Sequence, residues 1–173
     1  MQVGPVYHTG FTVSDIERSV VFYRDVLGLR LVNRKTGTAP YLATITGFEG
    51  VRLEVAHLQP PAGGSMLELL QYVSHPASAT DRATNRPGNA HLCFKVDDLR
   101  AAWAELRRRG VTLVSEPTEI TAGAHAGGWA VYFRDPDGFT VELYQGPLAS
   151  PVEPGATAST VRHAGGGGGG RSA

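Results

Sequence analysis

Residues 7–15 read YHTGFTVSD, and residues 90–98 read AHLCFKVDD. The histidine, the phenylalanine, the valine and the last aspartate fall at matching positions in the two stretches. Each half of the chain then closes on a strand-like run with one glutamate, MLELL at 66–70 and TVELY at 140–144. Such repetition indicates an internal duplication. One histidine and one glutamate per copy can converge by approximate two-fold symmetry, which predicts a divalent metal site.

The bulk composition predicts a soluble globular protein and excludes several functions. Hydrophobic residues make up 42% of the 173 residues, and 16 basic residues balance 16 acidic ones. This neutral balance argues against a nucleic-acid partner. The single cysteine excludes an internal disulfide framework and a cysteine-rich zinc site. We see neither a signal peptide nor an apolar run of about 20 residues, so we expect a cytoplasmic protein without a membrane segment.

The first half of the chain predicts a strand, a helix and further strands. We expect a strand at 8–13 and then a helix with Ser14 as N-cap, Glu17 reaching back as a capping box, and Gly28 at its end. The remaining candidate strands are 29–33, 41–45, 52–58 and 66–72.

The second half repeats this order after a polar stretch. We interpret 1–74 as a first module, 75–89 as a linker and 90–146 as a second module. Its helix ends at Gly110, and its candidate strands are 91–96, 111–115, 129–134 and 139–145, the last following the turn signal DPDG at 135–138. Residues 147–173, rich in Pro, Ala, Ser and Gly, predict a disordered tail.

Strand alternation places four candidate ligands on the faces of their strands that lie opposite the apolar rows. Successive side chains of a strand point to opposite faces. By this rule His8, Glu68, His91 and Glu142 leave their strands on the side away from the apolar rows, where they would line a concave groove. Imidazoles with carboxylates suit one divalent ion, which could be Zn, Ni, Co, Mn or Fe(II). Glu68 is the weakest member of the set, because Glu54 and Gln71 lie close to it in sequence.

The other histidines receive structural interpretations. His57 is expected on a surface strand and His75 in the linker. His125 lies in a glycine-rich stretch at 121–128, which is either a lid over a substrate or a long hairpin connection; we favour the lid.

The two repeated stretches, together with FYRDVLGL at 22–29 and DPDGFTVEL at 135–143, resemble the vicinal oxygen chelate superfamily. That superfamily includes glyoxalase I, methylmalonyl-CoA epimerase, extradiol dioxygenases and bleomycin-resistance proteins. The resemblance covers about residues 3–146. It implies an α+β fold of paired βαβββ modules whose mixed sheets curl around a metal groove, with His8, Glu68, His91 and Glu142 as ligands. It also implies a homodimer. The chain lacks the paired histidine usual in the second module of methylmalonyl-CoA epimerases.

Three functions follow from this interpretation. The first is a metal-dependent lyase, isomerase or epimerase acting on a small molecule with vicinal oxygens, with Glu142 as the base and Glu68 serving the opposite face. The second is an Fe(II) extradiol dioxygenase using His8, His91 and Glu142, against which Glu68 argues because it would take a position that substrate needs. The third is a protein that sequesters a drug without catalysis, in a groove lined by aromatic residues such as Tyr132.

Overall fold

Two four-stranded sheets, one from each half of the chain, form the framework of the computed structural model, which describes residues 1–78 and 81–147. The first sheet has the order β1-β4-β3-β2 and comprises β1 (His8–Thr12), β2 (Arg30–Gly37), β3 (Leu53–Gln59) and β4 (Met66–Tyr72). The second has the order β5-β8-β7-β6 and comprises β5 (His91–Lys95), β6 (Thr118–Glu119), β7 (Trp129–Arg134) and β8 (Thr140–Gln145). In both sheets the first strand is parallel to the last and the other pairings are antiparallel. The predicted α+β fold and its duplication are confirmed.

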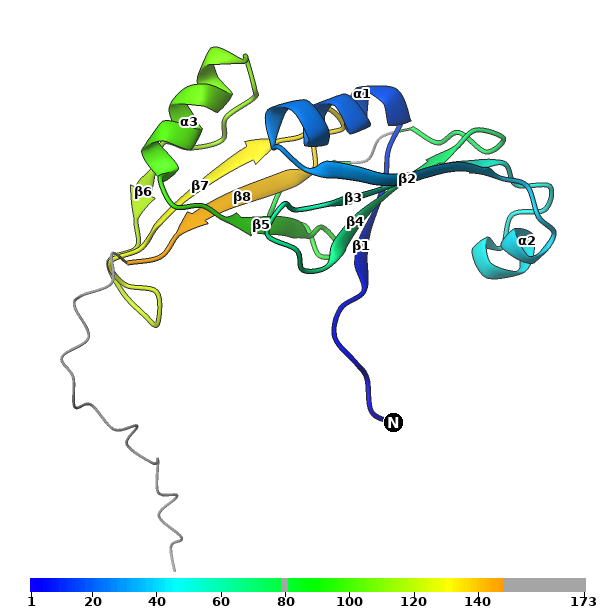
Figure 1. Cartoon of the computed structure of the whole chain (residues 1–173), viewed down its shortest axis with the longest axis horizontal. Helices are drawn as coiled ribbons and strands as arrows, with labels where there is room; N and C mark the ends of the chain where they lie inside the picture. Colours follow the sequence, from blue (N-terminus) through cyan, green and yellow to red (C-terminus); the bar gives the residue numbers. More distant parts are fainter. Residues whose placement is uncertain (79–80, 148–173) are drawn as a thin grey trace, which may run out of the picture.

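Helices cover one side of both sheets. α1 (Ile16–Val21) continues into the π-helical turn η1 (Phe22–Val26), and α3 (Leu99–Arg108) covers the second sheet on the same side (Figure 1). One apolar core includes residues of both halves. Within it, the Phe11 ring stacks on Phe139 with centroids 4.4 Å apart, and Phe22 lies 6.5 Å from Phe133. The two halves therefore share one hydrophobic interior.

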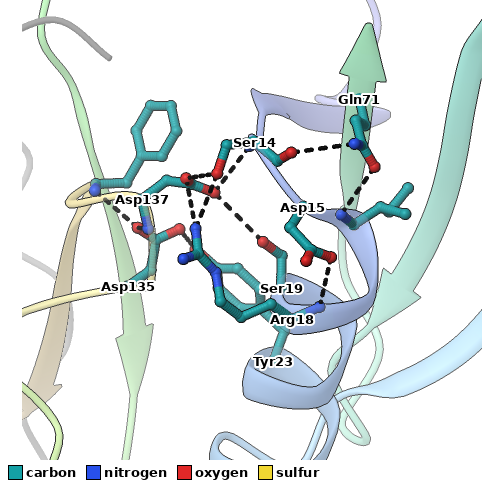
Figure 2. Close-up of polar contacts among 10 residues, drawn as sticks. Ser14, Asp15, Arg18, Ser19, Tyr23, Gln71, Asp135 and Asp137 are labelled. Atoms are coloured by element: carbon teal, nitrogen blue, oxygen red, sulfur yellow. Dashed lines mark hydrogen bonds and ion pairs between the residues drawn. The ribbon is translucent and has the colours of Figure 1, made fainter. Parts of the chain in front are cut away.

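A polar contact also joins the halves, where the turn between β7 and β8 meets the start of α1 (Figure 2). Asp137 accepts hydrogen bonds from the backbone N–H and the hydroxyl of Ser14 and pairs with Arg18 at 2.8 Å. Tyr23, which is fully buried, donates its hydroxyl to Asp135 at 2.9 Å. Burial raises the pKa of Asp135. This contact fixes the first helix against the opposite sheet.

The predicted capping box at the start of α1 is wrong. Asp15, not Ser14, is the N-cap, and its carboxylate accepts from the Arg18 N–H at 3.1 Å. The reason is that Asp137 engages Ser14 from the other half. Glu17 forms an ion pair with Arg34.

Two predicted strands are also wrong. Residues 41–45 belong to a short helix, α2 (Tyr41–Thr46), which has Pro40 at its N-cap and Gly47 in the left-handed conformation at its C-cap. Periodicity cannot separate helix from strand in so short an apolar run. Residues 111–115 form no strand of their own: Leu113 makes a single bridge to Phe133, while β7 pairs with β6.

The predicted tail, residues 147–173, lies outside the described residues except for Pro147. Among the helices that the structure describes, none has both the length and the apolar character needed to span a membrane.

Candidate metal centre

The four predicted ligands occupy equivalent positions in the two sheets. Gly10 of β1 is the register partner of Glu68 on β4, and Cys93 of β5 is the partner of Glu142 on β8. Each histidine lies two residues before that position, at His8 and at His91. Because side chains two residues apart share a face, each histidine projects beside the glutamate of its own sheet. The same register thus recurs in both copies.

The first pair lies on the sheet of β1 and β4, and a third residue joins it. His8 Nε2 is 3.4 Å from Glu68 Oε2, and His57 Nε2 is 3.1 Å from Glu68 Oε1. The His57 side chain is only 14% exposed, against 38% for His8. The prediction of a surface role for His57 is therefore wrong. Its position on β3, directly opposite Glu68, could have been found only with the antiparallel register of β3 and β4.

The second pair lies on the sheet of β5 and β8. His91 Nε2 is 3.1 Å from Glu142 Oε2, and the ring of Tyr132 lies 5.3 Å from that of His91. Desolvation, reinforced by Glu142, raises the pKa of the Cys93 thiol to about 12, so this cysteine stays protonated at neutral pH. Desolvation and Glu142 also raise the pKa of Tyr132. Cys93 and Tyr132 therefore place neutral groups next to the Glu142 carboxylate.

We call His8 with Glu68 the first half-site and His91 with Glu142 the second half-site. Within residues 1–78 and 81–147 of one chain, no group of three or more His, Cys, Asp or Glu side chains is placed to hold a metal ion. The structure therefore places the four predicted ligands in two separate pairs, and the two pairs do not meet within one chain.

Residues near the half-sites have structural partners. Glu54 alternates with Val55 on β3, so it lies on the opposite face from Glu68, where it accepts a hydrogen bond from Thr36. Gln71 accepts the backbone N–H of Ile16 at the start of α1. His125 lies against Tyr144, with ring centroids 5.4 Å apart. Since Tyr144 shares a face with Glu142, the loop that carries His125 approaches the strand of the second half-site.

Comparison with known proteins gives one consistent family. Residues 6–143 match the model of the Glyoxalase/Bleomycin resistance protein/Dioxygenase superfamily. The chain is 30% identical to a 2-epi-5-epi-valiolone epimerase from Actinomyces sp, over 86% of this chain and 82% of that protein. It is 30% identical to a lactoylglutathione lyase from Haemophilus influenzae, over 81% of this chain and 91% of that protein.

A solved structure shows the same fold. A glyoxalase family protein from Bacillus cereus superposes with a TM-score of 0.74, covering 86% of this chain and 97% of that one at 21% identity.

Proposed function

Because this chain belongs to the Glyoxalase/Bleomycin resistance protein/Dioxygenase superfamily, we propose that it is a metal-dependent lyase or epimerase that moves a proton on a carbon beside a carbonyl. The observation that carries the proposal is the recurrence of one His–Glu pair at the same register in both sheets. Relatives named as an epimerase and as a lactoylglutathione lyase support this reaction class.

The donor set suits a divalent metal. His8, Glu68, His91 and Glu142 provide two imidazoles and two carboxylates, which favour Zn, Ni, Co, Mn or Fe(II). Each imidazole Nε2 already faces a carboxylate oxygen at 3.1–3.4 Å, so cation-binding atoms are turned toward each other in both pairs. When bound, the ion would act as a Lewis acid that lowers the pKa of the C–H group next to a chelated carbonyl.

A homodimer would complete the site, with the first half-site of one copy facing the second half-site of the other. Two observations support this arrangement. One chain keeps the pairs separate, and β1 and β5, which carry the histidines, each lie at an edge of their sheet. An edge strand leaves its outer side open to another chain. In this arrangement each dimer holds two equivalent sites.

The carboxylates would carry the proton. Glu142 takes it from the carbon beside the carbonyl, and Glu68 serves the opposite face of the substrate. His57 and His8 hold both oxygens of Glu68, while His91 holds Oε2 of Glu142. Among the residues that the structure describes, the other oxygen of Glu142 has no histidine partner, which favours Glu142 as the first proton acceptor.

Elemental analysis combined with solvent deuterium exchange tests the proposal. We expect about one divalent ion per chain in the dimer, and exchange of the proton beside the carbonyl in 2-oxo or 2-hydroxycarbonyl compounds. In Glu142→Gln we expect exchange to fall about 100-fold or more, while metal remains bound. Glu54→Gln, on the opposite face of β3, is the matched control and should keep full exchange. Full exchange in metal-loaded Glu142→Gln would rule out the proposed role of Glu142.

Two other functions would give different results with the same purified protein. Oxygen uptake with catechols in the presence of Fe(II) would indicate an extradiol dioxygenase. A metal-free protein that binds a drug in its groove would indicate sequestration without chemistry.

A further inference from the structure

A groove with a volume of about 720 Å³ lies between α2 and the concave face of the first sheet. Glu68 of the first half-site lines it, so the groove is continuous with the candidate metal centre. Small-molecule sites usually measure about 300–1,000 Å³. The groove therefore has the size and the position of a pocket for the part of a substrate that extends away from the metal.

One wall of this groove is apolar. A small cluster of Val51, Leu53 and Val55, separate from the main core, lies on the concave face with Leu42 of α2 packed against it. α2 also exposes large apolar side chains, with Tyr41 at 56% and Ile45 at 73% exposure, and both line the groove. Exposed apolar residues gathered around a cavity favour binding of an apolar ligand.

The sequence makes room for α2 at Gly37. A Cβ at this position would lie 2.9 Å from Cδ1 of Leu42, so the Leu42 side chain would have to shift. The missing side chain lets Leu42 keep its present position against β2. Figure 1 shows α2 on the side of the strands opposite to α1, at the far end of the molecule from α3.

We propose that this groove binds an aliphatic or aryl group of the substrate, whose vicinal oxygens face the metal. The assignment rests on the proposed function and adds the substrate class: a vicinal-oxygen compound with a substantial apolar substituent. Lys35 at the rim adds an ammonium group, which favours substrates that also carry a negative charge near that end.

Hydroxamic acids of increasing length test the substrate class on the metal-loaded protein. Their two oxygens chelate metal, and only the longer ones reach the groove. Affinity should rise about threefold to fourfold for each methylene buried, since one CH₂ contributes about 0.8 kcal/mol. Affinity that does not change from acetohydroxamate to octanohydroxamate would overturn the groove assignment and leave the metal site standing. Failure of every hydroxamate, acetohydroxamate included, would instead count against the metal site.

A measurement without metal tests the groove independently of the metal site. Anilinonaphthalene sulfonate should fluoresce on binding the metal-free chain, and octanohydroxamate but not acetohydroxamate should displace it. Ile45→Glu should weaken binding of this probe about tenfold, because it places a carboxylate in the groove. The control is Val21→Glu, an exposed apolar helix residue outside the groove. Equal probe binding by the two variants would overturn the proposal, as would conversion of a dimer to a monomer by Ile45→Glu alone.

Discussion

His57 contacts Glu68, one of the predicted metal ligands, and this contact was not predicted from the sequence. It is register partner to Glu68 and contacts Oε1, while His8 faces Oε2. The carboxylate is thereby fixed between two imidazoles. Loss of a group that orients a metal ligand in this way commonly lowers metal affinity about 10- to 100-fold. We therefore infer that His57 positions Glu68 for metal binding.

We expect His57→Phe to lower metal affinity about 10- to 100-fold, because it keeps the ring but removes the contact with Glu68. Titration of zinc or nickel against a competing chelator measures the change. His75→Phe, outside both half-sites, is the control. A His57→Phe protein with unaltered metal affinity would contradict the positioning role.

Tyr23 makes a buried contact whose loss is measurable. Its hydroxyl donates to Asp135, and both residues are buried. Tyr23→Phe should lower the free energy of unfolding by about 1–3 kcal/mol, because it leaves a carboxylate oxygen without a donor. Urea denaturation measures this, with Tyr41→Phe, whose side chain is 56% exposed, as the control. Equal stability of the two variants would show that water replaces the lost donor.

At the scale of elements, the duplication extends to the capping of the helices. Asp15 caps α1 and Asp98 caps α3, each through a hydrogen bond to a backbone N–H three residues on. Gln71 on β4 accepts the N–H of Ile16, and Gln145 on β8 accepts that of Leu99. In both sheets this glutamine lies three residues after the predicted metal-binding glutamate. The strand that carries the predicted ligand therefore also anchors the helix.

The start of α1 depends on the opposite half of the chain as well. We expect Asp137→Ala to lower the free energy of unfolding by about 1–3 kcal/mol, because Ser14 and Arg18 both lose their acceptor. Asp25→Ala is the control, since the Asp25 carboxylate pairs with exposed Arg24 and surface pairs contribute little. Chemical denaturation compares the two. If Asp137→Ala is no less stable than Asp25→Ala, the contact does not hold the halves together.

Sequence reasoning succeeded where elements are regular and failed where tertiary contacts decide. Strong alternation predicted β4 and β8 and the face on which Glu68 and Glu142 lie. The helix α2 was predicted as a strand, because Tyr, Leu and Ile in a short run suit either state. The N-cap of α1 was predicted one residue too early, at Ser14. Ser14 instead donates to Asp137, which is distant in sequence and so could not be foreseen as its partner.

For the whole molecule, the predicted fold was confirmed, whereas the assembly of the four predicted ligands around one ion stays a prediction. The repeat predicted four ligands and the faces on which their side chains lie. It could not predict which half-site would face which, because the contact of Phe11 with Phe139, which joins the two halves, lies in the core and not at the half-sites. The structure adds the separation of the pairs within one chain.

Complementation between two inactive variants tests the assembly. Glu68→Gln damages the first half-site and Glu142→Gln the second. If sites form between chains, an equal mixture that exchanges subunits should recover about a quarter of wild-type proton exchange, since half of the dimers are mixed and each has one intact site. Sites within single chains would give no recovery. Each variant alone is the baseline, and Glu54→Gln mixed with wild type controls for subunit exchange itself.

The helix α2 belongs to the first half only, whereas the ligand pairs occur in both. A pseudo-symmetric pair of carboxylates alone would accept a substrate in either of two opposed orientations. The groove beneath α2 would remove this degeneracy, because it adds an apolar wall beside Glu68 of the first half-site. The handedness of the reaction would then be set by a six-residue helix rather than by the residues that touch the proton.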